Sequence, residues 1–198
     1  MNYAPKSTSP CIETLLCVDG VVSNLIWHQA RFDNTRRELY SDTSRLTLSE
    51  HLPLLPKGTY RVRLEYTHEI LNVDVFPLVP RRFETLCCVE ADMEYSYKYA
   101  NRSALNALIP TNVDDVIVTC KGELRDTSIA NIALCIEGQW LTPKTPLLEG
   151  TTRARLLASG MLKTAILTTQ SLQKAQKFAI INALLGFHVL KNPCFKGI

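Results

Sequence analysis

Short apolar stretches separated by turn residues dominate the first 80 positions, which is the pattern of strands. The dipeptide Asp19-Gly20 separates two such stretches and favours the two-residue turn of a β-hairpin. Residues 27–40 instead have helical spacing, with side chains three or four positions apart on the same side. His28, Phe32 and Leu39 therefore share one side of a predicted helix. The predicted strands are residues 12–18, 21–25, 59–66 and 70–76.

Pro77-Leu78-Val79-Pro80 interrupts this pattern and marks a predicted boundary between two lobes. We expect a smaller N-terminal α/β lobe over residues 1–80 and a larger, β-rich C-terminal lobe over residues 81–198. Residues 178–185 fit either a helix or a strand. The other elements predicted in the second lobe are strands at 83–89, 115–120, 129–136 and Trp140, one strand in the tail between 163 and 190, and helices at 101–109 and 151–159. The fold class is therefore mixed (α+β and α/β), with mostly antiparallel strands and short helices.

The composition is that of a globular protein, because 46% of the 198 residues are hydrophobic and 21% are charged. No apolar run approaches the ~20 residues that cross a bilayer. The first ten residues also lack the apolar segment of a signal peptide. We therefore expect a cytoplasmic protein with no membrane partner. The net charge of +3 comes from dispersed lysines and arginines, which argues against nucleic acid and leaves small anions as partners.

The seven cysteines are scattered without a CxxC pair, although Cys87 and Cys88 are adjacent. This spacing fits neither a disulfide framework nor a zinc site. We expect reduced, buried thiols and no metal.

An anion-binding loop is predicted at Glu149-Gly150-Thr151-Thr152-Arg153, which follows a proline-bearing stretch and opens a helix. Gly150 lets the backbone approach a ligand closely. The first N–H groups of the helix and the hydroxyls of Thr151 and Thr152 can donate to a phosphate, and the helix N-terminus favours negative charge. The alternative is an ordinary helix capped by threonine.

Three further residues or pairs carry candidate chemistry. Lys98 lies in Tyr95-Ser96-Tyr97-Lys98-Tyr99, where apolar rings favour the neutral amine of a Schiff-base lysine; the alternative is a solvated loop lysine. Asp126 is a candidate because it is an acidic residue that leads into an apolar strand. The alternative is an aspartate that only caps a turn. His28 and Arg31 are three apart on one helical face, so they can reach one pocket, unless the arginine only snorkels to solvent.

Arg61 and Arg63 are two positions apart on a predicted strand and therefore point to one face. Because guanidinium binds carboxylate in a forked geometry, the pair is a candidate clamp for substrate carboxylates. The alternative is a solvated strand face on which the arginines pair with Glu65 and Glu69.

Together these segments resemble the class IV aminotransferase family, the fold-type IV pyridoxal-phosphate enzymes. The resemblance covers most of the chain. It runs through Ile12-Glu13-Thr14-Leu15, His28-Gln29-Ala30-Arg31-Phe32, Lys98 with Asn101-Arg102, residues 126–131, and Gly150-Thr151-Thr152-Arg153. It implies a two-lobed architecture with pyridoxal 5′-phosphate in the crevice between the lobes, and it implies a homodimer.

The resemblance assigns a role to each matched residue. Lys98 would form the Schiff base with the cofactor and move the α-proton. Arg31 would hold the cofactor phosphate together with the backbone N–H groups of Thr151 and Thr152 and the Thr152 hydroxyl. Asn131 would complete the cofactor-binding set.

Asp126 would face the pyridine nitrogen and keep it protonated, because the opposite charge favours the protonated ring. The family usually carries a glutamate here, and aspartate is one methylene shorter. We also expect two segments to depart from the family. The N-terminal strand and glycine-rich loop that usually precede Glu13-Thr14 would be absent, and the C-terminal lobe after Arg153 would be shorter.

Within the family, Lys98-Tyr99-Ala100-Asn101-Arg102 is closer to 4-amino-4-deoxychorismate lyase than to branched-chain aminotransferases, which usually have glycines after the lysine. Thr14 lies where the lyase carries a threonine implicated in its elimination step. Arg102 joins Arg61 and Arg63 as a candidate for binding substrate carboxylates. We therefore expect a pyridoxal-phosphate-dependent lyase that converts an amino-acid-like, carboxylate-bearing substrate into 4-aminobenzoate and pyruvate. The alternatives are an aminotransferase acting on a small amino acid, a shortened cofactor-binding homologue without turnover, and a plain globular domain.

Overall fold

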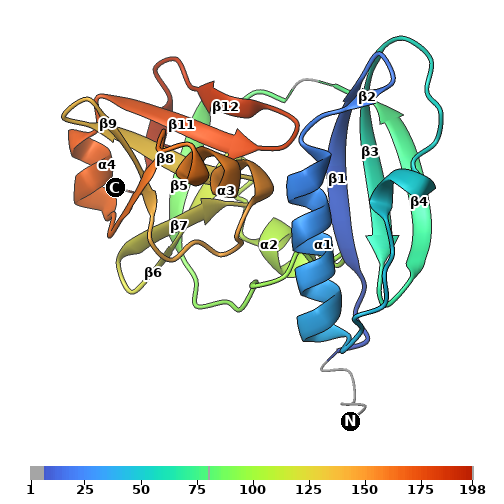
Figure 1. Cartoon of the computed structure of the whole chain (residues 1–198). Helices are drawn as coiled ribbons and strands as arrows, with labels where there is room; N and C mark the ends of the chain where they lie inside the picture. Colours follow the sequence, from blue (N-terminus) through green and yellow to red (C-terminus); the bar gives the residue numbers. More distant parts are fainter. Residues whose placement is uncertain (1–6, 80, 198) are drawn as a thin grey trace. The chain divides into compact units, whose positions relative to one another are not determined.

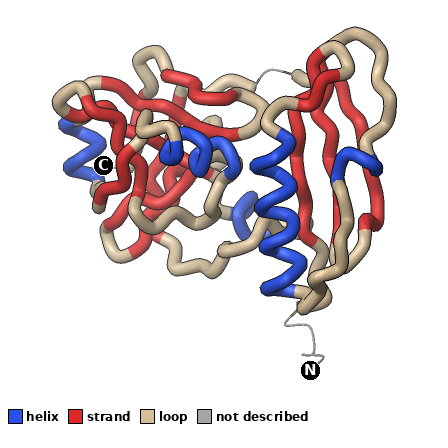
Figure 2. The backbone as a smooth tube through the Cα atoms, viewed as in Figure 1, coloured by secondary structure: helices blue, strands red, loops and turns tan. Residues whose placement is uncertain are grey.

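The computed structural model describes residues 7–79 and 81–197, which divide into two compact units. The first unit comprises residues 7–79 and 97–101, and the second comprises residues 81–96 and 102–197. Strands dominate both units, and the helices are few and, apart from the one at residues 25–39, short, as Figure 2 shows. Among the strand pairs of the described residues, three are parallel and the others are antiparallel, so the predicted mixed, mostly antiparallel fold is confirmed.

The first unit is a four-stranded antiparallel sheet with α1 (Leu25–Leu39) lying against one face (Figure 1). The strand order is β2 (Val21–Val22), β1 (Cys11–Val18), β3 (Thr59–Tyr66) and β4 (Ile70–Pro77), and a short 3-10 helix, η1 (Leu48–His51), follows α1. Alternate residues of β1 and β3 pack with α1 in one core, in which the Phe32 and Tyr66 rings meet edge to face at 4.6 Å.

The predicted hairpin turn forms, with Asp19 at a φ of 49° and Gly20 at 82°. The strand predicted after it stops at Val22, because Asn24 adopts a left-handed conformation and turns the chain into α1. The helix therefore begins at Leu25, two residues earlier than predicted.

Residues 97–101 belong to the first unit, whereas the sequence placed Lys98 in the second lobe. Backbone hydrogen bonds explain the difference. The Ile12 N–H donates to the Lys98 carbonyl at 2.8 Å, and the Ala100 N–H donates to the Pro10 carbonyl at 2.8 Å. An antiparallel bridge between Cys11 and Tyr99 completes this attachment to the start of β1.

The second unit is built on a nine-stranded mixed sheet with three short helices. The strand path is β10 (Lys163–Ala165), β9 (Gln139–Pro143), β8 (Asn131–Ile136), β7 (Glu123–Thr127), β6 (Asp115–Cys120), β5 (Thr85–Glu90) and β13 (Cys194–Lys196), with β11 (Lys177–Asn182) paired to β8 and to β12 (Gly186–Val189). The helices are α2 (Ser103–Ala107), α3 (Thr151–Ala158) and α4 (Thr169–Lys174). Buried apolar residues of the central strands form its main core.

Residues 178–185, left open between helix and strand, contain strand β11, which runs antiparallel to β8 with Phe178 opposite Leu134. The sequence does not predict the short elements η1, β7, β13 and α4, and it predicts one further strand within residues 163–190, where both β10 and β12 form. In β7 the side chains of Leu124 and Asp126 both point inward, so a carboxylate occupies a position where alternation would call for an apolar residue. The pattern of hydrophobic residues therefore does not predict this strand.

Candidate functional site

The centre of the candidate site in the second unit is the buried carboxyl of Asp126, at the end of β7. Asn131, the first residue of β8, donates from its side-chain amide to Asp126 Oδ1 at 2.8 Å. The backbone N–H of Leu148 donates to Asp126 Oδ2 at 2.9 Å. The same Asn131 amide also donates to the Leu148 carbonyl at 2.8 Å, so the three residues form one closed network.

Burial raises the pKa of the Asp126 carboxyl to about 7, although hydrogen bonds from Asn131 and Leu148 and the charge of Arg153 act in the opposite direction. Removing the group from water disfavours its charged form more than these contacts favour it. The folded protein therefore favours the protonated form of this acid to a higher pH than water does. A cation placed beside it would make it ionise.

Gly150 joins the predicted anion loop to this network. A β-carbon at this position would lie 1.9 Å from the Asn131 side-chain oxygen, which no real contact allows. Its backbone is extended, at φ −70° and ψ 142°, and no side chain caps the helix that starts after it. Glycine is required here because of the close approach of Asn131.

Thr151 and Thr152 open α3, and both are buried. Arg153 holds this helix start in place, because one guanidinium nitrogen donates to the Pro143 carbonyl at 2.9 Å and another pairs with Glu149. A buried helix N-terminus with two hydroxyl residues and no side-chain cap has the donors that an anion needs.

In the first unit, Arg31 and His28 of α1 converge on Glu13 of β1. Arg31 binds the Glu13 carboxylate through two nitrogens, with Nε to Oε1 at 2.8 Å and Nη2 to Oε2 at 2.6 Å. His28 Nδ1 lies 2.6 Å from Glu13 Oε2, and it carries the proton of this contact because an ionised carboxylate only accepts. Glu13 and His28 are almost fully buried.

Burial alone would raise the pKa of Glu13, but the Arg31 charge and the hydrogen bonds from His28 and Arg31 outweigh it and lower the pKa to about 2. Glu13 has no predicted role of its own, although it lies in one of the matched motifs. A signal was available, because alternation puts Glu13 on the inward face of β1 with Cys11 and Leu15. A carboxylate on an apolar face needs a buried cation.

Lys98 is half-buried and lies in the segment that is bonded to β1 through its backbone. The rings of Tyr97 and Tyr99, on either side of it in sequence, meet at 6.1 Å. Thr14 is half-buried on the face of β1 opposite to Glu13, where it is in register with Arg63 of β3.

The two predicted clamp arginines differ in their surroundings. Arg63 contacts Glu65 at 2.8 Å, which is one of the two ion pairs expected if this strand face is solvated. Its second acidic partner is Asp74, at 3.4 Å, and not the expected Glu69. The Arg61 guanidinium stacks over the Phe76 ring at 4.6 Å. In the second unit, Arg102 donates from Nη2 to the Ser128 carbonyl.

The sequence-predicted residues are divided between the two units. The first unit contains Thr14, Arg31, Arg61, Arg63 and Lys98, and the second contains Arg102, Asp126, Asn131, Thr151 and Thr152. The described residues hold no group of three or more potential metal ligands. No helix in the described part of the chain is long and apolar enough to cross a membrane.

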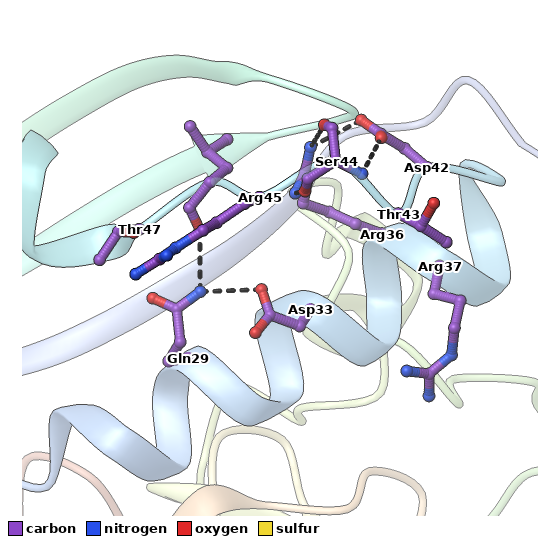
Figure 3. A pocket seen from close by; sticks show the side chains of 10 residues that line it. Gln29, Asp33, Arg36, Arg37, Asp42, Thr43, Ser44, Arg45 and Thr47 are labelled. Atoms are coloured by element: carbon purple, nitrogen blue, oxygen red, sulfur yellow. Dashed lines mark hydrogen bonds and ion pairs between the residues drawn. The ribbon is translucent and has the colours of Figure 1, made fainter.

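A cavity of about 380 Å³ lies in the first unit between the polar side of α1 and the loop 42–47 (Figure 3). Its lining contains none of the predicted site residues. Gln29 bridges Asp33 and the Leu46 carbonyl across one side of it, while Arg36 holds Asp42 and Ser44 on the other. These contacts connect the loop 42–47 to α1.

Comparison with known proteins gives a family and a set of similar structures. The family model of amino-transferase class IV matches residues 96–191. An uncharacterised protein of Haemophilus influenzae is 31% identical over 187 residues, which span 89% of this chain and 98% of that protein.

Two solved structures are similar over most of their length. A proposed 4-amino-4-deoxychorismate lyase from Haemophilus somnus is 29% identical, with a TM-score of 0.81 over 91% of this chain and 98% of that chain. A hypothetical aminotransferase from Mycobacterium tuberculosis, in a PLP-bound form, is 18% identical, with a TM-score of 0.73 over 96% of this chain and 82% of that chain. The second likeness is one of fold alone.

Proposed function

Because the chain belongs to the class IV aminotransferase family, as the sequence predicted, we propose that it is a pyridoxal-phosphate-dependent lyase. The proposed substrate is an aminodeoxychorismate-like amino acid, and the products are 4-aminobenzoate and pyruvate. The lyase reaction is preferred to transamination for two reasons. The Haemophilus somnus protein, at 29% identity, is a proposed lyase of this kind, and Lys98-Tyr99-Ala100-Asn101-Arg102 resembles the lyase pattern.

The observation that carries the proposal is the buried Asp126 carboxyl with its pKa of about 7, fixed by Asn131 and Leu148. When bound, pyridoxal phosphate supplies an aldehyde that captures an amine and a ring that accepts electrons best when its nitrogen is protonated. Asp126 fits this requirement because, once ionised, it stabilises a neighbouring proton on nitrogen. Both of its oxygens are held by protein donors, so its position does not depend on the ligand.

The remaining donors also suit this cofactor. Thr151 and Thr152 offer hydroxyls and helix N–H groups to a phosphate. Arg31 uses two nitrogens on Glu13, and a guanidinium has five N–H donors, so it keeps donors for a second anion. We propose that Thr151 and Thr152 hold the phosphate, and we keep Arg31 as a proposed cofactor-binding residue, as the family resemblance implies.

Lys98 is the proposed covalent anchor of the cofactor and the base that removes the proton from the amine-bearing carbon. The proposed elimination divides the atoms of the substrate between its two products and needs no further reactant. Thr14 is the proposed proton relay: its hydroxyl would pass a proton to the departing enolpyruvate and regain the one that Lys98 has removed. Arg61 is a stronger candidate than Arg63 for a substrate carboxylate, because Arg63 already contacts two carboxylates and Arg61 contacts an aromatic ring.

The first test is to add pyridoxal phosphate to the purified protein, record its visible spectrum, reduce with borohydride and map the labelled peptide. We expect a single labelled residue, Lys98. The Lys98→Ala variant should keep its far-ultraviolet circular dichroism and lose the label. Label spread equally over surface lysines in both proteins would contradict the cofactor assignment.

The second test separates the reactions. A lyase releases 4-aminobenzoate and pyruvate in equal amounts from aminodeoxychorismate. An aminotransferase instead converts the bound cofactor to its amine form when an amino acid is added without a keto acid. Covalent label at Lys98 with neither reaction would identify a cofactor-binding homologue without turnover. The homodimer that the resemblance implies is tested by sedimentation equilibrium.

A further inference from the structure

The turn between β7 and β8 connects the two side chains at the centre of the candidate site. Asp126 and Asn131 are the one residue pair by which β7 and β8 join in the sheet. Inside the turn, the Thr127 hydroxyl accepts from the Ala130 N–H at 3.0 Å, and the Thr127 N–H donates to the Ala130 carbonyl at 2.8 Å. Because the two strands are paired at a single residue position, their pairing contributes little rigidity to the hairpin.

Two residues outside the hairpin hold its tip at Ser128. Arg102, which precedes α2, donates from Nη2 to the Ser128 carbonyl. Asp115, the fully buried first residue of β6, accepts from the Ser128 N–H at 3.3 Å. The peptide groups on both sides of Ser128 are therefore anchored, one by a cation and one by an anion.

We propose that Arg102 and Asp115 are positioning residues, which clamp Ser128 and thereby keep the Asp126 carboxyl buried against Asn131. The function of the clamp rests on the proposed role of Asp126 toward the cofactor. The clamp itself is a property of the protein alone. It gives Arg102 a different role from the substrate binding that the sequence suggested.

The hydrogen bonding of these residues supports a role in positioning. The Nε of Arg102, the Oδ2 of Asp115 and the Oγ of Ser128 are all buried without a hydrogen-bond partner in the described part of the chain. Asp115 Oδ2 has only a long contact of 3.8 Å to Arg81. A buried charged group with unsatisfied hydrogen-bonding atoms lowers the stability of the protein. Proteins retain such groups mainly at functional sites, where the position of a side chain is needed for function.

The consequence for Asp126 can be measured without any cofactor. The groups that act on its carboxyl are Asn131, the backbone N–H groups of Leu147 and Leu148, and the charge of Arg153, and burial outweighs all of them. If the tip of the hairpin is released, water reaches the carboxyl. Hydration then stabilises the ionised form.

The experiment is a carbon-13 NMR titration of the Asp126 carboxyl in the cofactor-free protein, assigned with Asp126→Asn. We expect Arg102→Gln to lower the titration midpoint by about one pH unit or more. Arg102→Lys, which keeps a cation but loses the forked geometry, should give a smaller decrease. The matched control is Arg81→Gln, which also removes a cation near Asp115 but does not touch Ser128, and its midpoint should match that of the wild type.

An unchanged midpoint in folded Arg102→Gln or Arg102→Lys would overturn the proposal. So would an equal shift in Arg81→Gln. If Arg102→Gln does not fold, Arg102→Lys provides the test. A substrate-binding role for Arg102 would instead raise KM and leave the midpoint unchanged. Because the titration needs no pyridoxal phosphate, failure of the protein to bind the cofactor would contradict the proposed function and leave the result for the clamp intact.

Discussion

The side-chain oxygen of Asn131 lies 1.9 Å from the point where a β-carbon on Gly150 would stand. These residues are far apart in sequence, and the contact joins the start of β8 to the start of α3. It couples the buried Asp126 carboxyl to the predicted anion loop, since the same Asn131 amide donates to Asp126.

Gly150→Ala should therefore destabilise the second unit by about 1–3 kcal/mol, because the new methyl group must push Asn131 away from Asp126. In the background of Asn131→Ala the clash is gone, so the same substitution should cost less than about 0.5 kcal/mol. Trp140 is in the second unit and Trp27 in the first, so Trp27→Phe leaves one tryptophan to report this unfolding. Equal costs in both backgrounds would show that the two side chains do not interact.

Asp126 should make the second unit less stable as the pH rises. Its pKa is raised from 3.8 to about 7 in the folded protein, so the folded state holds a proton that the unfolded chain loses. The stabilisation is fully present below 3.8 and is lost as the pH rises through 7. Between pH 5 and 8 the free energy of unfolding should fall by roughly 2–3 kcal/mol relative to Asp126→Asn. A flat difference between the two proteins over this range would contradict the raised pKa.

Glu13 should have the opposite pH dependence. Its pKa is lowered from 4.5 to about 2, so its stabilisation of the first unit is present above 4.5 and is lost as the pH falls toward 2. Glu13→Gln should remove this acid-induced loss. At neutral pH it should cost about 3–5 kcal/mol, because the Arg31 charge loses its partner.

The matched control is Glu65→Gln, which removes a more exposed acid from its ion pair with Arg63 and should cost less than about 1 kcal/mol. Both are measured by the Trp27 fluorescence of a Trp140→Phe protein. Similar costs for the two substitutions would mean that the buried network does not support the first unit.

Arg36 should be the main support of the loop 42–47 in Figure 3. Its buried guanidinium donates to the Ser44 and His68 carbonyls, to the Ser44 hydroxyl and to the Asp42 carboxylate at 2.6–3.0 Å. Arg36→Met should cost about 3–5 kcal/mol, because it leaves these acceptors without a donor. Arg37→Ala, at the exposed next position, should change the stability by less than about 0.5 kcal/mol. If Arg36→Met and Arg37→Ala lowered the stability by similar amounts, the buried guanidinium of Arg36 would not be the main support of this loop.

The sequence by itself determined most of the long elements and the segments from which the candidate site is built. Strand β3 carries a clear periodic pattern, because one of its faces lies in the core of the first unit and the other carries Arg61, Arg63 and Glu65. Helix α1 could be recognised from the spacing of His28, Phe32 and Leu39, which share its buried side. Strands β1 and β4 could be recognised only by their apolar content, since Ile12 is buried on the second face of β1 and Leu71 and Phe76 are exposed on β4. The loop before α3 could be recognised because glycine followed by hydroxyl residues opens a helix. The family could be recognised because its motifs are local runs of residues.

Tertiary structure alone decided the properties that depend on distant partners. Strand β7 forms because β6 and β8 pair with it, although its inward position at Asp126 is charged. Glu13 is acceptable on an inward face because Arg31 and His28 reach it from α1. The pKa of Asp126 depends on how completely the surrounding chain excludes water. The role of Arg102 depends on which carbonyl group its side chain reaches. Burial and pairing are relations between segments, so no window of sequence contains them.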